Sequence, residues 1–230
     1  MTETKLYIVR HGKTMFNTIG RTQGWSDTPL TKEGVEIIHY LGKGLKEIPF
    51  INAYSSDSGR AMQTAQIILG EHPAGSTIPY QTDARIREWC FGSLDGGYNG
   101  ELWGVVPRIL AFKNYDEMMT HHITYKELAN AIIEADTANW AEPYSKIHKR
   151  VWEGFKNIAH QTEKNGGGNT LVVSHGLTIS FLLSLIDSTL PMQISLENGS
   201  VTTLLYAKDR FTIDKVNNIQ YIKNGKKQHD

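Results

Sequence analysis

Two stretches of this chain follow the same local pattern, Leu6-Tyr-Ile-Val-Arg-His11-Gly12 and Thr170-Leu-Val-Val-Ser-His175-Gly176. Continuous apolar runs of this length are typical of strands that are buried on both faces of a parallel sheet. In open α/β sheets, ligands bind beyond the carboxyl ends of the strands, so we expect the two histidines to meet there and form a site. The alternative is that each histidine is an isolated strand-end residue bonded to backbone.

Helical patterns alternate with the strands along the chain. Apolar residues recur every three or four positions in these segments, which is typical of helices with one buried face. The sequence therefore predicts an α/β fold with three layers, αβα, built on a mainly parallel central sheet with an antiparallel edge. The other expected elements are helices that begin at Thr31, Ser58 and Pro143 and a helix over 177–186, together with a strand over 53–56 and a hairpin of 200–206 and 211–216 that turns at Lys208-Asp209.

Residues 98–142 carry a helical pattern without a strand and are rich in aromatic side chains, among them Trp103, Tyr115 and Trp140. We interpret this segment as a helical insertion that lies over the edge of the sheet and covers the active site. Its aromatic residues are either packing residues or the wall of a substrate pocket. No linker separates independent units, so we expect residues 1–230 to form a single domain.

The composition excludes several classes of protein. The chain has 230 residues and is 40% hydrophobic, which is enough for a buried core. Its 24 Lys and Arg are balanced by 24 Asp and Glu, so we expect no nucleic-acid partner and no membrane binding. The single cysteine, Cys90, excludes an internal disulfide and a cysteine-rich zinc site. A reducing compartment suits such a chain, and we predict a cytoplasmic location.

Two arginines favour a phosphorylated ligand. Arg10 precedes His11, and Arg60 lies just beyond the end of another expected strand, so both side chains could reach the same crevice. Guanidinium groups match phosphate oxygens in two-pronged contacts, and helix N-termini add N–H donors. The alternative for Arg60 is a solvated residue in the first turn of a helix.

Three other patterns do not indicate a site. Gly12-Lys13-Thr14 resembles the end of a P-loop, but the first glycine of that motif would fall on Tyr7. Ser174 lies where a hydrolase nucleophile would, but that motif needs glycine in place of Val172. His121 and His122 are adjacent, and adjacent helical side chains diverge, so we interpret the pair as solvated rather than metal-binding.

Five ordered blocks together resemble the histidine phosphatase superfamily, whose fold is that of the phosphoglycerate mutases. They cover roughly residues 5–100 and 143–207. The blocks are Arg10-His11-Gly12, the segment from Asn17 to Gly34 with Gln23-Gly24, the segment from Ser55 to Ala65 with Arg60, the segment from Arg87 to Gly96 with Glu88, and Ser174-His175-Gly176.

The resemblance implies a role for each matching residue. His11 would be the nucleophile that accepts the phosphoryl group, and Glu88 would protonate the leaving oxygen and later take a proton from water. The oxygens would be bound without a metal or another cofactor, since fixed cations stabilise the charge of the transferring group. The implied phosphate-binding residues are Arg10, Asn17, Gln23, Gly24, Arg60, His175 and Gly176, of which Arg10, Arg60 and His175 are also catalytic.

The surroundings of these residues suggest how they would work. Nearby arginines disfavour protonation of His11, which keeps an attacking nitrogen free near neutral pH. Trp89 and Phe91 would give Glu88 the apolar surroundings that suit a general acid. The alternative for Glu88 is a salt bridge to Arg85 or Arg87.

Departures from the family pattern favour hydrolysis over a mutase reaction. Arg108 is the only arginine between Glu88 and Lys149, whereas the mutase branch usually shows an arginine pair and a proline-rich run there. Gln23-Gly24 also resembles the phosphatase branch, and Lys13 adds positive charge at the mouth of the site. We therefore predict a metal-independent phosphomonoester hydrolase that acts through a phosphohistidine on a small phosphorylated metabolite. The alternatives are a phosphoglycerate mutase and an inactive relative that binds a phosphorylated ligand or a partner; the oligomeric state stays open.

Overall fold

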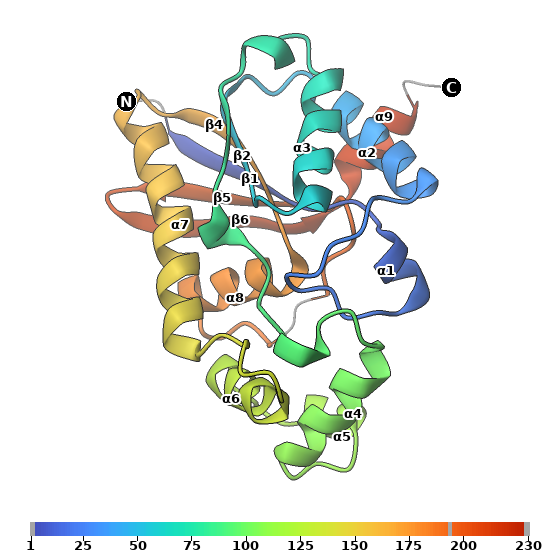
Figure 1. The fold of residues 1–230 in the computed structure, drawn as a ribbon. Helices are drawn as coiled ribbons and strands as arrows, with labels where there is room; N and C mark the ends of the chain where they lie inside the picture. The colour runs from blue at the N-terminus through green and yellow to red at the C-terminus, as the bar shows by residue number, and fades with distance from the viewer. Residues whose placement is uncertain (1–2, 193–194, 228–230) are drawn as a thin grey trace.

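A six-stranded sheet forms the centre of the computed structural model, which describes residues 3–192 and 195–227 (Figure 1). The strand order is β3-β2-β4-β1-β5-β6. The first four strands are parallel to one another, and β5 pairs antiparallel with both β1 and β6. The predicted αβα fold with its antiparallel edge is confirmed. The strands are β1 (Thr4–Arg10), β2 (Phe50–Ser55), β3 (Tyr80–Thr82), β4 (Gly168–Ser174), β5 (Val201–Ala207) and β6 (Arg210–Asn218).

The register of β1 against β4 aligns the two repeated stretches. Arg10 pairs with Ser174 at the carboxyl ends of these parallel strands, so His11 and His175 leave the sheet at the same level. On the other side of β1, the predicted hairpin is formed by β5 and β6. Its turn residues Lys208 and Asp209 have φ of 51° and 63°, the left-handed conformations that two-residue hairpin turns require.

Helices cover both faces of the sheet because successive strand residues point to opposite sides. Tyr7 and Val9 of β1 pack with α2 and α3, whereas Leu6 and Ile8 pack with α7 and α8. Figure 1 shows α2, α3 and α9 on one side of the strands and α7 on the other. These helices are α2 (Lys32–Leu45), α3 (Gly59–Glu71), α7 (Tyr144–Lys164), α8 (Gly176–Ile186) and α9 (Gln220–Lys227), and a one-turn helix, α1 (Met15–Ile19), follows β1.

Three elements that pack here were not predicted: α1, α9 and the edge strand β3. The helix α9 lies against α2 at a close crossing, where a Cβ on Gly225 would overlap the carbonyl of Tyr40 and a Cβ on Gly44 would overlap that of Tyr221. The eight residues of α9 are mostly polar, and β3 has only three residues. Neither α9 nor β3 is long or apolar enough to show a clear hydrophobic periodicity in the sequence.

The insertion is helical, as predicted, and packs on the same core as α7 and α8. It consists of α4 (Asn99–Ile109), α5 (Tyr115–Met119) and α6 (Tyr125–Ala135), and short 3-10 turns precede it at Ala84–Ile86 and Gly92–Leu94, with another earlier in the chain at Gly75–Thr77. This continuous core supports the single domain that we propose. No helix within residues 3–192 and 195–227 is both long and apolar enough to cross a membrane.

Asp136 ties the end of α6 to the chain that follows Glu88. Its buried carboxylate accepts hydrogen bonds from the backbone N–H groups of Ser93 at 2.7 Å, Ala138 at 2.9 Å, Trp140 at 2.6 Å and Ala141 at 2.7 Å. Burial alone would raise the pKa of Asp136, but the hydrogen bonds outweigh it and hold the pKa well below its usual 3.8.

Substituting Asp136→Asn is expected to lower the free energy of unfolding at pH 7 by about 2–4 kcal/mol, since an amide oxygen accepts more weakly and its NH₂ group faces N–H donors. A depressed pKa stabilises the fold above the unfolded-state pKa of about 4, and this contribution is lost as the pH falls below that value. The difference from wild type should therefore shrink at pH 3.5. Urea unfolding at both pH values measures it, with the exposed Asp116→Asn as the control; a constant difference would contradict this account.

Candidate active site

The two histidines meet as expected. The ring centroids of His11 and His175 lie 5.2 Å apart with an angle of 58° between the rings, and both side chains are almost fully buried. His11 follows the end of β1, and His175 follows the end of β4 at the N-cap position of α8, so the parallel pairing of β1 with β4 sets their separation. The isolated strand-end alternative is therefore wrong for this pair.

The hydrogen bond of His11 determines which ring nitrogen is free. Its Nδ1 lies 2.8 Å from the carbonyl oxygen of Gly12, and because that oxygen only accepts, Nδ1 carries the proton in the neutral ring. The unprotonated nitrogen is then Nε2. Burial, Arg60 and Arg10 hold the pKa of His11 well below its usual 6.5, so the ring is neutral at pH 7. This arrangement suits a nucleophile.

His175 has the opposite tautomer. Arg60 donates from Nη2 to its Nδ1 at 3.0 Å, so Nε2 carries the proton and lies 3.3 Å from the Oγ of Ser58. Burial, Arg60 and His11 keep the pKa of His175 well below 6.5. His175 is therefore a neutral ring whose Nε2–H faces Ser58.

Arg60 lies behind His175 rather than in the cavity. It is fully buried, and its two terminal nitrogens donate to the carbonyl oxygens of Ser26 at 2.9 Å and Gly24 at 2.7 Å, to Asp27 Oδ1 at 2.8 Å and to His175. Its Nε–H has no partner among the described residues. The solvated alternative for Arg60 is therefore wrong, and its side chain is not on the surface of the cavity that Arg10 enters.

Glu88 lies between the 3-10 turns Ala84–Ile86 and Gly92–Leu94, on the cavity surface, and its carboxylate is bonded to the first turn of α8. Its Oε1 accepts from the N–H of Trp89 at 3.1 Å and from both the N–H and the Oγ of Thr178 at 2.9 Å, while Oε2 accepts from the N–H of Leu177 at 3.0 Å. Oε2 has the fewer donors and is the oxygen with room for a proton. The surroundings of the Glu88 carboxyl group are thus more polar than its sequence neighbours Trp89 and Phe91 indicated.

The salt bridge that was the alternative for Glu88 is not formed. Arg85 pairs instead with Asp83 at 2.6 Å, and Arg87 pairs with Asp57 at 2.5 Å. Both acceptors lie outside the cavity. The carboxyl group of Glu88 is therefore held by neutral donors of the chain and not by a guanidinium group.

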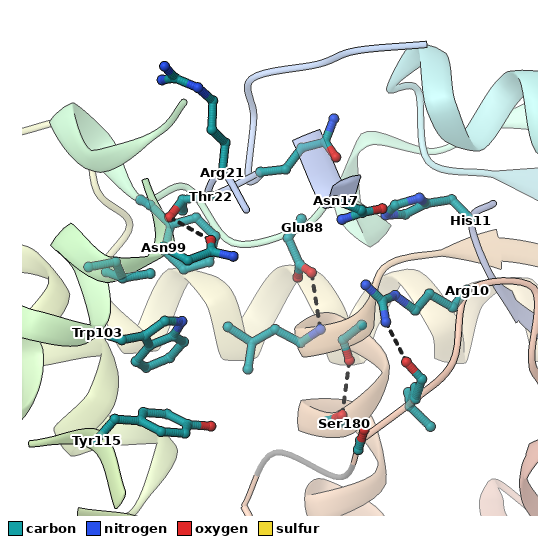
Figure 2. A pocket seen from close by; sticks show the side chains of 17 residues that line it. Arg10, His11, Asn17, Arg21, Thr22, Glu88, Asn99, Trp103, Tyr115 and Ser180 are labelled. Carbon is teal, nitrogen blue, oxygen red and sulfur yellow. Dashed lines mark hydrogen bonds between the residues drawn. The ribbon is translucent and has the colours of Figure 1, made fainter. Parts of the chain in front are cut away.

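A cavity of about 350 Å³ opens beside His11, Arg10 and Glu88 (Figure 2). Arg10 enters it from the end of β1 and is anchored by a hydrogen bond to the carbonyl of Leu196. Trp103 and Tyr115 of the insertion form the opposite wall, with ring centroids 5.1 Å apart. The remaining lining residues are Asn17, Arg21, Thr22, Gln23, Phe91, Asn99, Leu102, Gly176, Leu177, Ser180, Ser195 and Leu196.

Most of the expected site residues line this cavity, but three do not. Arg10, His11, Asn17, Gln23, Glu88 and Gly176 are on its surface. His175 and Arg60 lie behind it, and Gly24 lines a neighbouring hollow of about 250 Å³ with its N–H bonded to Asp95 at 2.8 Å. The N–H of Gly24 is therefore not free to bind phosphate.

Several residues of the site escaped the sequence analysis. Asn198 donates to the carbonyl of His11 at 2.9 Å and to Asn17 Oδ1 at 3.3 Å, and Asn17 Oδ1 also accepts from the N–H of Thr14 at 3.1 Å. Arg21 and Asn99 line the cavity. These are polar residues of loops and helix ends, and no local periodicity distinguishes them from solvated positions.

The family model of the histidine phosphatase superfamily, branch 1, matches residues 6–219. The chain belongs to this superfamily. The match spans both histidines and the insertion, so the resemblance of the five blocks is confirmed.

Two similar proteins carry the name of phosphoglycerate mutase. A probable phosphoglycerate mutase, GpmB of Yersinia pestis, is 29% identical over 180 residues, which is 78% of this chain and 73% of that protein. A phosphoglycerate mutase structure from Bacillus anthracis has 36% identity and a TM-score of 0.92, covering 98% of this chain and 97% of the other. The Bacillus stearothermophilus YhfR structure has 27% identity and a TM-score of 0.74, covering 95% and 99%. The superfamily and these relatives support a phosphoryl-transfer enzyme.

Within residues 3–192 and 195–227, no group of three His, Cys, Asp or Glu side chains is arranged so that it could hold a metal ion. His121 and His122 are exposed on the insertion. His121 lies near Thr120 and the carbonyl of Glu117, as a solvated residue would. Both side chains are therefore exposed, as expected.

Substituting Trp103→Ala is expected to raise the KM for an aryl phosphate about 10-fold, since a buried aromatic contact contributes about 1–2 kcal/mol. Inhibition by inorganic phosphate should be unchanged, because Trp103 lies across the cavity from His11 and Arg10. Steady-state kinetics of 4-nitrophenyl phosphate hydrolysis measure both. Trp140→Ala, at a residue that is 72% exposed and outside the cavity, is the matched control. Equal effects of the two substitutions would show that Trp103 does not bind the ester.

Proposed function

We propose that this protein is a metal-independent phosphomonoester hydrolase that forms a phosphohistidine at His11 and acts on a small phosphorylated metabolite. The observation that carries the proposal is the unprotonated Nε2 of a neutral His11 beside a cavity that also holds Arg10 and Glu88. The buried Nε–H group of Arg10, a residue on the cavity surface, has no partner among the described residues. Buried donors are normally paired, and the oxygens of a bound phosphate are suitable acceptors.

In the first step, Nε2 of His11 attacks phosphorus and the bond from phosphorus to the ester oxygen breaks. Arg10 stabilises the oxygens of the transferring group from the cavity surface, while the Asn17 NH₂ group, which has no partner among the described residues, adds a donor at the cavity wall. Oε2 of Glu88 gives its proton to the departing oxygen, so an alcohol leaves and Glu88 becomes a carboxylate.

In the second step, water attacks phosphorus from the space that the alcohol has left. Glu88 takes one proton of this water as the N–P bond breaks, which returns His11 to its neutral form and releases phosphate. Both steps use the same two groups, and the fixed positive charge of the arginines supports the transferring group throughout.

Hydrolysis is favoured over mutase chemistry by the charges of the cavity wall. Arg10 and Arg21 are the cationic side chains on its described surface, and Arg108 lies exposed on α4 outside it. The insertion contributes Trp103 and Tyr115 in place of a cluster of cations. Such a wall gives a phosphoglycerate carboxylate few partners, so the intermediate would pass to water instead of to a retained product.

The names of the mutase relatives favour the alternative function, a phosphoglycerate mutase. One pair of assays distinguishes the mutase from the hydrolase. Purified protein in chelator is expected to release phosphate from 4-nitrophenyl phosphate and from several metabolite esters. Conversion of 3- to 2-phosphoglycerate, with and without the bisphosphate primer, should be slow in comparison. Mutase turnover faster than hydrolysis would reverse the assignment, and loss of activity in chelator would remove the metal-independent mechanism.

We also propose a cytoplasmic location, because the single cysteine, Cys90, is buried and cannot form an internal disulfide. The proposed partner is the small phosphorylated substrate alone. The balanced charge supports the absence of nucleic-acid binding.

A further inference from the structure

The short segment that carries Glu88 is held by a side chain of α7. Arg150 donates from Nη1 to the carbonyl oxygens of Arg85 at 3.0 Å and Arg87 at 2.8 Å, and from Nη2 to that of Glu88 at 2.9 Å. The carbonyl of Ile86 between them accepts from the Oγ of Ser174 at 2.8 Å. Four successive carbonyls of an irregular segment are thus bonded to side chains rather than to a strand or helix.

Glu142 completes the environment of Arg150. The Nε of Arg150 lies 3.0 Å and 3.1 Å from the two carboxylate oxygens of Glu142, and Nη2 lies 2.7 Å from Oε2. All five N–H donors of the guanidinium group therefore have acceptors. The carboxyl group of Glu142 is buried and fixes the plane of the Arg150 guanidinium group. The guanidinium group therefore donates to the three carbonyls in one orientation.

The backbone of α7 approaches the same segment closely. Gly154 is one helical turn beyond Arg150, and a Cβ there would lie 2.9 Å from Cβ of Arg85 and 3.0 Å from Cγ2 of Ile86. The residues four apart on α7 share one face, so Arg150 and Gly154 meet the Glu88 segment together. α7 is therefore the element against which that segment is placed.

We propose that Arg150 is a positioning residue for Glu88: by clamping the carbonyls of residues 85, 87 and 88, it keeps the carboxyl group where it can protonate the leaving oxygen. The inference rests on the proposed phosphomonoesterase. Arg150 is not among the residues that line the cavity. A lysine at this position would keep the charge but has no planar fork to hold three carbonyls and a carboxylate.

The dependence on the leaving group tests this role. An aryl oxygen such as that of 4-nitrophenyl phosphate leaves with little help from an acid, whereas the alkyl oxygen of glycerol 2-phosphate needs the proton of Glu88. In a mechanism with a phosphoenzyme, kcat/KM reports the first step alone. Arg150→Lys and the neutral pair Glu142→Gln/Arg150→Met are expected to lower kcat/KM for glycerol 2-phosphate about 10–100-fold. For 4-nitrophenyl phosphate the fall should be less than about 3-fold, which a general loss of structure would not produce.

Amide hydrogen exchange gives a second readout that does not depend on activity. The N–H groups of Leu177 and Thr178 donate to the carboxylate of Glu88, so both should exchange faster in the two variants. Lys149→Met, at the exposed neighbouring position on α7, should leave both kinetics and exchange unchanged. An equal fall for both esters, or exchange of these amides at the wild-type rate, overturns the proposal. Wild-type protein that hydrolyses neither ester rejects the hydrolase assignment instead, and the exchange result then decides the role of Arg150.

Discussion

Substituting His11→Ala is expected to lower kcat for 4-nitrophenyl phosphate by about 10⁴-fold or more, because no other group can form the covalent intermediate. The Nε2 of His11 is the free nitrogen of a neutral ring beside Arg10, and His175 has its Nε2 protonated. His175 therefore cannot replace it. Phosphate release under single-turnover and steady-state conditions measures the loss.

Folding and chemistry can be separated in the same variant. Arg10 and Asn17 remain in place, so inorganic phosphate should still raise the Tm of His11→Ala. Rapid denaturation after mixing with substrate should trap an acid-labile phosphoenzyme in wild type only. His122→Ala, at an exposed residue of the insertion, is the matched control and should be fully active. Appreciable turnover by His11→Ala would mean that water attacks the ester directly.

The fold could be predicted because its signals are local. The apolar runs before His11 and His175 are buried strands, and the helices from Thr31 and Pro143 have one apolar face, so periodicity identified them. The short polar helix α9 was missed, since it is stabilised by a close glycine crossing with α2 and not by its own pattern. Tertiary contacts of this kind leave no trace in a single segment.

The sequence predicted which residues form the site better than it predicted where their side chains lie. The strand ends identified the histidines and Arg10, but sequence alone could not show that the guanidinium group of Arg60 is turned toward the backbone of Ser26 and Gly24. Arg150 lies 62 residues after Glu88 and bonds to its carbonyl oxygen, so only the packing of α7 against the Glu88 segment brings the two together.

Substituting Glu88→Gln is expected to lower kcat/KM for glycerol 2-phosphate about 10²–10⁴-fold, the range that positioned general acids contribute. Glutamine is nearly isosteric, and its carbonyl oxygen can still accept from Thr178, so the fold should be preserved. Its NH₂ group, however, cannot supply the proton that an alkyl leaving group needs. The fall for 4-nitrophenyl phosphate should be much smaller, because that oxygen departs as an anion.

A second consequence follows from the role of Glu88 as base. Once the nitrophenol has left, the phosphoenzyme of Glu88→Gln should accumulate, since no carboxylate is present to take a proton from the attacking water. A burst of nitrophenol followed by slow turnover would reveal this in a stopped-flow measurement. Glu134→Gln, at an exposed position of α6, is the control and should show neither effect. If Glu88→Gln slowed both esters equally and showed no burst, Glu88 would only hold the start of α8, and another group would have to move the proton.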